Sequence, residues 1–353
     1  NVLKFQYPNV TTSGSWRTGG SLNTARENLA GLGASGTAAL AFGGAPPGSG
    51  LAITELYAGT SWTEVNDLNN GRYGLAGAGV TTAGLAFGGG VDPNVYKTET
   101  EVWNGTNWTE VNNLSTGRRY LAGFGSSTSA LAAAGADSEA YTADVELWNG
   151  TNWTEVNNVN DARRHFAGSG TDNTSGLVFG GETPPATGNT ESWNGTNWTE
   201  VNNLNTGRPG IAGATQGTVT STLAFGGDPP PGAAVITELW NGTNWVEQND
   251  MSTARGYLAG AGTVPSALAF GGSPGPVTAA TEEWSVGAPI GAWATGNNVN
   301  LARRFLAGSG TATAGLIFGG SGPPSTMVGA TESYNGTNWT EVNDMTQARQ
   351  AVA

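Results

Sequence analysis

Residues 239–272 read LWNGTNWVEQNDMSTARGYLAGAGTVPSALAFGG, and the whole chain is built from variants of this stretch. The same landmarks recur in residues 192–227, SWNGTNWTEVNNLNTGRPGIAGATQGTVTSTLAFGG. One marker Trp identifies each unit, at positions 16, 62, 108, 153, 198, 245, 293 and 339, so that the units are 45 to 48 residues long. An Arg follows each marker Trp ten residues later, and a Gly-Gly pair closes six of the hydrophobic runs, whereas the third unit has Ala134-Gly135. A period of this length indicates a repeat architecture.

Short hydrophobic runs alternate with turn residues along each unit, and helical periodicity is absent. Each unit is expected to have four strand types, counted from the inside of a sheet outward. Residues 257–262 exemplify the first type, residues 267–272 the second, residues 237–240 the third and residues 245–247 the fourth. The innermost strand is rich in Ala and Gly, whose small side chains suit the crowded centre around which the sheets are expected to lie. The sequence NGTN favours a tight hairpin, because Asn and Gly tolerate positive φ, and would place Trp240 opposite Trp245. Such a unit predicts one blade of an all-β β-propeller.

The order of these landmarks resembles the Kelch repeat. A hydrophobic strand ends in Gly-Gly (LAFGG), followed by Glu-x-aromatic (TELW or TESY), by Trp (NW), and by Arg ahead of the next strand (TAR or TGR). The resemblance covers nearly the whole chain and implies a β-propeller of four-stranded blades. In its low charge and its Asn, Thr, Gly and Trp content, the chain is more loosely similar to structural proteins of marine tailed phages.

The number of blades is predicted from the landmarks. Eight marker Trp and eight following Arg, but only seven second strands, favour eight blades in a single domain, residues 1–353. The eighth blade would be split, with its inner strand from residues 349–353 and its outer strands from residues 2–18. Segments 1–25 and 340–353 would then close the ring and leave no open sheet edge. The alternative is seven complete blades with both ends as extensions.

Composition limits the classes of function. Charged residues are 12% of the chain while 13 Trp are present, the opposite of a disordered composition. With no Cys and one His, disulfides, thiol catalysis and multi-His metal sites within the chain are excluded. A net charge of −13 argues against a nucleic-acid partner, and no apolar run is long enough for membrane insertion. The sequence begins at Asn1 rather than Met, which indicates a processed chain or a partial record of a longer protein.

Charged side chains recur once per unit, which indicates a structural role. The Arg series is expected to pair with a Glu series or to cap backbone carbonyls between blades. A second Glu follows most marker Trp, but equivalent sites supply no pair of carboxylates in different environments, as acid–base catalysis requires. His165 stands where other units have Tyr or Phe, and we interpret it as a tolerated variant. The Glu series comprises Glu55, Glu101, Glu146, Glu191, Glu238, Glu282 and Glu332.

Known chemical motifs do not match the chain. The Kelch family includes a copper oxidase whose site needs several His and a Cys-linked Tyr, which this sequence cannot supply. A calcium-binding DxDxDG loop and a phosphate-cradling glycine loop are both missing from the sequence. The Asn-x-Thr triplets, at Asn104 and Asn107 for example, coincide with the predicted hairpins, so turn chemistry explains them. We therefore expect a non-enzymatic protein with no catalytic residue, no metal and no cofactor.

Variation is concentrated in the loops between second and third strands, such as GVDPNVYK at 90–97 and ADSEAYTAD at 136–144. These loops share one face with the nearly constant connections from fourth to first strands. Variable loops on a rigid scaffold are typical of recognition surfaces, and Pro lowers the entropy cost of ordering them. Unconstrained drift of the loops is the alternative interpretation. The predicted ligand-binding residues are Asp92, Tyr96, Lys97, Asp137, Glu139, Tyr141, Glu182 and Asp228.

The sequence thus predicts a non-enzymatic extracellular or virion-surface binding module, similar to a phage tail fibre or appendage. It would recognise a cell-surface glycan or protein, or a neighbouring virion protein, with no nucleic acid and no membrane insertion, and homo-oligomerisation is left open. One alternative is a structural or assembly protein of a virion or surface layer. The other is a hydrolase or lyase acting on polysaccharide, which would need one asymmetric polar cleft.

Overall fold

The regular structure of the chain consists of β-strands. The computed structural model describes residues 14–46, 50–138, 140–286, 299–302, 307–311, 314–322, 326–335 and 338–349. Within these residues every regular element is a strand. The chain divides into two compact units, Asn1–Ala288 and Pro289–Ala353, which are described separately. The prediction of one domain over residues 1–353 stays a prediction.

In the residues described for the first unit, 24 of the 26 strands form six four-stranded antiparallel sheets. Sheet 1 contains β2 (Ala30–Ser35), β3 (Ala38–Phe42), β4 (Thr54–Tyr57) and β5 (Trp62–Val65). Sheet 2 contains β6 (Ala76–Val80), β7 (Ala83–Phe87), β10 (Thr100–Trp103) and β11 (Trp108–Val111). Sheet 3 contains β12 (Ala122–Ser126), β13 (Ser129–Ala136), β14 (Tyr141–Trp148) and β15 (Trp153–Val156). A short hairpin, β8 (Gly90–Val91) and β9 (Val95–Tyr96), lies between β7 and β10.

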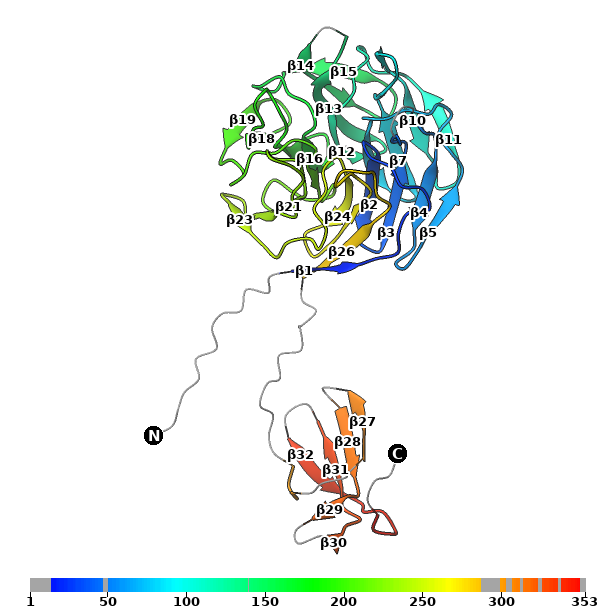
Figure 1. Cartoon of the computed structure of the whole chain (residues 1–353), viewed down its shortest axis with the longest axis vertical. Coiled ribbons are helices and arrows are strands. Elements are labelled where there is room, and N and C mark those ends of the chain that lie inside the picture. The colour runs from blue at the N-terminus through cyan, green and yellow to red at the C-terminus, as the bar shows by residue number, and fades with distance from the viewer. Residues whose placement is uncertain are drawn as a thin grey trace. The chain divides into compact units, whose positions relative to one another are not determined.

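The remaining sheets of this unit follow the same order. Sheet 4 contains β16 (Ala167–Asp172), β17 (Ser175–Phe179), β18 (Thr190–Trp193) and β19 (Trp198–Val201). Sheet 5 contains β20 (Ala212–Gly213), β21 (Thr222–Phe225), β22 (Thr237–Trp240) and β23 (Trp245–Glu247). Sheet 6 contains β24 (Ala259–Thr263), β25 (Ser266–Phe270), β26 (Thr281–Ser285) and β1 (Ser15–Thr18). Repeated sheets of this kind, arranged around a common centre in Figure 1, are consistent with a β-propeller.

The predicted hairpin is confirmed. Trp240 lies directly opposite Trp245, and Gly242 between them has a φ of 92°. The first Asn of each described NGTN turn accepts backbone hydrogen bonds inside the turn, as Asn104 Oδ1 does from the amides of Thr106 and Asn107, both at 2.9 Å. The Asn-x-Thr triplets at these positions therefore have the turn role that was expected.

The predicted split closing blade differs from the structure. β1 was expected to join a strand from residues 349–353, but it pairs with β26 and completes sheet 6. The reason is that β1 carries a marker Trp of its own. Trp16 lies opposite Trp284, as Trp245 lies opposite Trp240, and takes the place of a fourth-strand residue. Residues 2–13 and 350–353, which hold the rest of the predicted blade, lie outside the described residues.

The inner strands are small because neighbouring sheets meet there. A Phe on the second strand of one sheet packs against the inner-strand Gly of the next. A Cβ at Gly77 would lie 2.6 Å from the Phe42 ring, and one at Gly31 would lie 2.5 Å from the Phe270 ring. The second contact joins sheet 6 to sheet 1 in the same way as the first joins sheet 1 to sheet 2. In order, β2, β6, β12, β16, β20 and β24 contact one another, and β24 contacts β2.

The marker Trp residues connect the outer parts of neighbouring sheets. Trp108 Nε1 donates to Thr54 Oγ1 of the preceding sheet at 3.0 Å. Trp62 of sheet 1 donates to Thr281 Oγ1 of sheet 6 at the same distance, and β1 supplies the corresponding bond from Trp16 Nε1 to Thr237 at 2.9 Å. These contacts bury the Trp rings and leave their N–H groups hydrogen-bonded, as buried indoles require.

Sheet 3 departs from the repeat and compensates for it. Ala133 occupies the position of the buried second-strand Phe, while Phe124 occupies an inner-strand position where sheet 6 has Ala261. Phe124 is fully buried and reaches Gly170 and Gly176 of sheet 4, so the aromatic ring fills the same interface from the neighbouring strand. Ala134 adopts the left-handed φ of 49° that Gly has in the other units, so the turn is retained despite the substitution.

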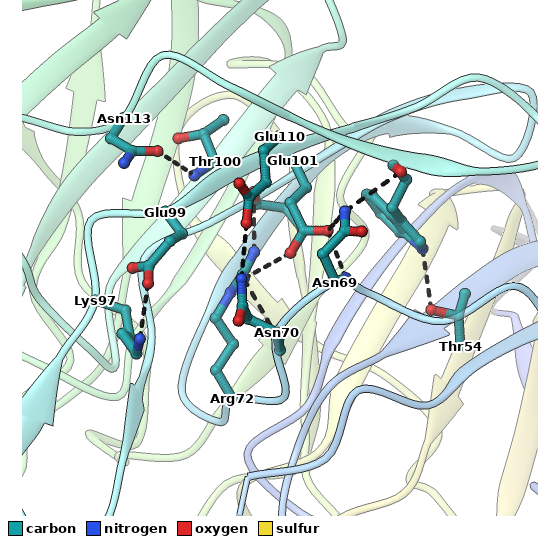
Figure 2. A network of polar contacts seen from close by, with 12 residues as sticks. Thr54, Asn69, Asn70, Arg72, Lys97, Glu99, Thr100, Glu101, Glu110 and Asn113 are labelled. Carbon is teal, nitrogen blue, oxygen red and sulfur yellow. Dashed lines mark hydrogen bonds and ion pairs between the residues drawn. The ribbon is translucent and has the colours of Figure 1, made fainter.

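Buried ion pairs repeat once per sheet in the first unit, as the sequence predicts. An Arg ahead of each inner strand contacts a Glu on the third strand of the same sheet, at 2.6 to 3.1 Å in five of the six pairs. Figure 2 shows the pair of Arg72 and Glu101, whose other carboxylate oxygen accepts the Asn69 amide at 2.8 Å. We call this series the Arg–Glu ladder: Arg26–Glu55, Arg72–Glu101, Arg118–Glu146, Arg163–Glu191, Arg208–Glu238 and Arg255–Glu282.

The inner strands of all six sheets line one central cavity of about 120 Å³, whose walls are mainly Ala and Gly. At the far ends of these strands the turn after β20 places Gln216 across the centre. The side-chain Nε2 of Gln216 donates to the carbonyls of Gly79 and Gly125 at 3.3 and 3.1 Å, and its backbone amide donates to the carbonyl of Gly262 at 2.9 Å. One residue therefore joins sheets 2, 3, 5 and 6 at this end of the cavity.

The second unit repeats the four-stranded pattern with β27 (Ala307–Thr311), β28 (Ala314–Phe318), β31 (Thr331–Tyr334) and β32 (Trp339–Val342). A short hairpin, β29 (Ser321–Gly322) and β30 (Thr326–Met327), lies between β28 and β31. Tyr334 lies opposite Trp339, as the aromatic pair does in the other sheets. Leu316 is 39% exposed, whereas its counterpart Leu268 in sheet 6 is fully buried.

Candidate binding site

Six backbone hydrogen bonds form a closed cycle at the entrance to the central cavity. The residue two positions after each ladder Arg donates its amide to the carbonyl of its counterpart in the preceding sheet, at 2.6 to 3.0 Å. All six have left-handed φ values between 52° and 64°. We call them the axial ring: Asn28, Gly74, Tyr120, His165, Gly210 and Tyr257. The cycle fixes a backbone conformation that L-residues otherwise avoid.

The side chains around this ring break the symmetry of the repeat. Asn and Gly occupy three of the six axial positions, while Tyr120, His165 and Tyr257 place aromatic rings at the others. The ring centroids of Tyr120 and His165 are 4.0 Å apart, and those of His165 and Tyr257 are 5.1 Å apart. These residues line a cavity of about 70 Å³ at the entrance. We call the surrounding polar and aromatic side chains the mouth cluster: Tyr73, Asp92, Tyr96, Arg119, Tyr120, Tyr141, Arg164, His165, Glu182 and Tyr257.

Arg119 lies among three tyrosines. Its guanidinium carbon is 4.9 Å from the Tyr96 ring centroid and 5.1 Å from that of Tyr120, within the range of cation–π contacts. Its Nη1 donates to the Tyr73 hydroxyl at 2.5 Å, and that hydroxyl donates to Asp92 Oδ1 at 2.6 Å. Aromatic faces and one hydroxyl therefore position this cation, while the carboxylate of Asp92 is 3.9 Å away.

Arg164, His165 and Glu182 form the second polar group of the cluster. Arg164 Nε donates to Glu182 Oε1 at 2.7 Å, and His165 Nδ1 is 3.4 Å from the same oxygen. The Arg164 guanidinium lies over the ring of Tyr141, 4.7 Å from its centroid. The hydrogen bond from His165, together with that from Arg164, lowers the pKa of Glu182 to about 2, so its carboxylate stays ionised.

Burial lowers the pKa of His165, and together with the positive charges of Arg164 and Arg119 it outweighs the hydrogen bond and the charge of Glu182, which act in the opposite direction. The neutral imidazole is therefore the favoured form in the folded protein. Because the unfolded chain takes up the proton first, the free energy of unfolding falls as the pH drops below the ordinary His value of about 6.5. We expect a loss of at most about 1.4 kcal/mol per pH unit from this group.

Urea unfolding at pH 7.5 and 5.5 measures this dependence. His165→Phe is the matched variant, because residues 303–305 read RRF where residues 163–165 read RRH. Its free energy of unfolding is expected to change less between the two pH values than that of the unmodified chain. Equal pH dependence in the two proteins would contradict the assignment of a neutral buried imidazole.

The structure brings together some of the residues predicted from sequence. Asp92, Tyr96, Tyr141 and Glu182 belong to the mouth cluster. Asp228 lies beside the axial ring, because its backbone amide donates to the carbonyl of Pro209, next to Gly210, at 2.7 Å. Burial, and after it the charge of Asp228, raise the pKa of Tyr257 to about 12. Their role as ligand-binding residues stays a prediction.

The other predicted residues have local partners or are not described. Lys97 Nζ lies 2.7 Å from Glu99 Oε1 in an ion pair, as Figure 2 shows. Asp137 Oδ1 accepts the amide of Ala140 at 2.9 Å within its own turn. Glu139 lies outside the described residues.

Sequence reasoning missed the residues at the centre of the cluster. Arg119, Tyr120, Arg164 and His165 occupy the two positions directly after the ladder Arg, in a connection interpreted as constant. These two positions read EN, YG, RY, RH, PG and GY in the first six units, so they vary more than the residues on either side. That local variation was the signal for a recognition site.

No protein-family model matches this chain, and none of the curated proteins matches it. The resemblance to the Kelch repeat therefore stays a prediction. Across the described residues, no helix is long and apolar enough to cross a membrane. In the same part of the chain, no three His, Cys, Asp or Glu side chains are grouped so as to hold a metal ion.

Proposed function

We propose that the chain is a non-enzymatic binding module that recognises a glycan through the mouth cluster. The observation that carries the proposal is the convergence at one entrance of side chains that the repeat does not need. Five of the eight Tyr residues and the single His of the chain belong to the cluster. Every one of the 13 Trp residues, in contrast, occupies a repeated position in the sequence.

The chemistry of the cluster suits a sugar. A sugar ring has apolar C–H faces and hydroxyl groups at its edge, and Tyr combines an apolar ring with a polar tip. Arg119 and Arg164 supply hydrogen-bond donors, and Glu182 supplies an acceptor that is ionised at neutral pH. A few fixed polar groups in an aromatic-lined hollow are typical of small-ligand sites.

The cluster is held in place before a ligand binds. The axial ring fixes the backbone of Tyr120, His165 and Tyr257, and cation–π contacts hold both arginines against aromatic rings. A site with little freedom to lose binds with a smaller entropy cost. This rigidity supports recognition as the role of the face.

We also propose that the first unit is a closed six-bladed propeller, in place of the eight or seven blades expected from the sequence. Three repeated contacts support it, because each continues from sheet 6 to sheet 1: the Phe270–Gly31 packing, the bond from Trp62 to Thr281, and the axial ring. β1 supplies the fourth strand of sheet 6. Closure of this kind removes the open edges of a sheet array.

We propose an extracellular or virion-surface location and a cell-surface glycan as the partner, following the low charge and the resemblance to phage structural proteins. The alternatives are an assembly role and enzymatic action on polysaccharide. The asymmetry of the mouth favours enzymatic action over assembly. Enzymatic action is opposed by the pKa of Glu182, which is about 2, because this carboxylate would not hold the proton that a general acid donates.

Binding of the full chain to an immobilised panel of neutral and acidic glycans tests the proposal. Tyr120→Asn is the informative variant, because Asn28 occupies the equivalent axial position in sheet 1 and the backbone conformation is thereby retained. Loss of the Tyr ring is expected to weaken binding about tenfold or more, as for a central aromatic contact. Isothermal titration with the best ligand measures it.

The control is Arg17→Ala, which changes a 70% exposed side chain outside the axial ring and the mouth cluster. Its affinity is expected to equal that of the unmodified chain. Equal affinity of Tyr120→Asn and the unmodified chain would exclude the mouth as the site. A folded chain that binds no glycan of a broad panel would refute the proposed function.

A further inference from the structure

Two arginines in the first unit stand apart from the rest of its positive charge. The residues described there contain ten Lys and Arg side chains, of which six form the ladder. Arg17 and Lys97 form ion pairs with Glu283 and Glu99. The other two are Arg119 and Arg164, and both belong to the mouth cluster, where Asp92 lies 3.9 Å from Arg119 and Glu182 pairs with Arg164 at 2.7 Å. In a chain with a net charge of −13, both remaining cations of the first unit's described residues therefore lie at one entrance.

Arg164 offers an open hydrogen-bonding edge. Its Nε is bonded to Glu182, but among the described residues neither Nη atom has a hydrogen-bond partner. Its side chain is 30% exposed, so solvent and a ligand can reach it. The ring of Tyr141 lies against its face and leaves the edge of the guanidinium free to form hydrogen bonds in its plane.

Arg119 adds a second positive charge on the same aromatic ring. Its guanidinium carbon is 5.1 Å from the Tyr120 centroid, and that of Arg164 is 5.7 Å from the same centroid. Its nearest carboxylate, Asp92, is 3.9 Å away with a side chain that is 51% exposed. The Arg119 side chain is only 13% exposed, but solvent reaches the Asp92 carboxylate and screens it, so Asp92 only partly offsets the charge.

We infer that the glycan recognised at the mouth carries a carboxylate, as uronic and sialic acids do, and that the free edge of Arg164 binds it with support from Arg119. The inference rests on the proposed function and adds the chemical class of the ligand. A guanidinium fork matches the planar carboxylate in two parallel, charge-assisted hydrogen bonds, whereas the hydroxyls of a neutral sugar carry no charge and accept weaker hydrogen bonds. The tyrosines around it would contact the sugar ring.

The test compares acidic and neutral forms of one ligand on the full chain. Trigalacturonate and sialyllactose are titrated beside carboxyl-reduced trigalacturonate and lactose. The acid forms are expected to bind about tenfold or more tightly, and Arg164→Lys, which keeps the charge but not the fork, is expected to remove most of that preference. Arg17→Ala, a change at a 70% exposed side chain outside the cluster, is the control and is expected to keep the preference.

The outcomes separate this inference from the proposed function. Equal binding of acidic and neutral forms would overturn the carboxylate and leave glycan recognition in place. Tighter binding of sulfated than of carboxylated oligosaccharides would also overturn it. Binding of none of these probes, nor of any glycan in the panel, would remove the proposed function itself. The comparison of ligands on the unmodified chain decides the matter even where Arg164→Lys does not fold.

Discussion

Replacement of Glu101 by Leu is expected to lower the free energy of unfolding by about 3–5 kcal/mol, because it leaves a buried positive charge without its partner. Arg72 and Glu101 are both fully buried, and their ion pair is 2.7 Å long. The other hydrogen bonds of the Arg72 guanidinium, to the carbonyls of Asn70 and Ala86, are both 3.5 Å long and therefore weak. Urea unfolding of the full chain measures the change.

The double variant Arg72→Met/Glu101→Leu separates charge from packing. It is expected to recover most of the lost stability, because two apolar side chains replace the pair without leaving a charge. Glu110→Gln is the matched control, since this Glu lies opposite Glu101 in the register of β10 and β11 but is exposed, and its effect should be under about 1 kcal/mol. If the double variant is as unstable as Glu101→Leu, the lost contact to Asn69 is the larger effect.

The sequence predicts the positions of the Arg–Glu ladder, the hairpins and the strands, because each of these features follows from residues that recur at one spacing. The prediction that Trp240 lies opposite Trp245 needed only the sequence NGTN between them, since a two-residue turn fixes the register of the two strands. The pairing of Arg and Glu required only that both recur once per unit. Local chemistry repeated eight times leaves few alternative structures.

The packing of sheet 3 could not be predicted from the repeat. Phe124 and Ala133 each look like a single deviation from the pattern, and only the structure shows that one ring fills the space left by the other. Likewise, the strand that completes sheet 6 is set by the long-range pairing of β1 with β26. A repeat count gives no information about such a pairing.

The candidate site was predicted in part for a related reason. Loop variation indicated four residues that the structure brings together, because Asp92, Tyr96, Tyr141 and Glu182 belong to the mouth cluster, and their role in binding stays a prediction. The centre of the cluster lies after the ladder Arg, where the chain enters each inner strand at the axis. Which variable residues meet depends on their distance from the axial ring, and the backbone hydrogen bonds of that ring join six sheets that are far apart in the sequence.

Replacement of Trp16 by Ala is expected to lower the free energy of unfolding of the first unit by about 3 kcal/mol and to free the edge of sheet 6. Its ring centroid is 5.0 Å from that of Phe225 and 5.4 Å from that of Trp284, and its Nε1 donates to Thr237. β1 is only four residues long, so without this anchor its pairing with β26 holds few contacts. Hydrogen exchange of peptides covering residues 281–285, read by mass spectrometry, measures the loss of protection directly.

The control is Arg17→Ala on the same strand. Its side chain is 70% exposed and paired with Glu283, so its removal is expected to cost under about 1 kcal/mol and to leave β26 protected. The two variants therefore distinguish the partly buried Trp16 ring from the ion pair of the exposed Arg17 side chain. Because sheet 6 contacts sheet 1, weakening β1 should also raise exchange in β2 and β24, which meet across that boundary. Unchanged protection of β26 in Trp16→Ala would show that another strand, and not β1, completes sheet 6.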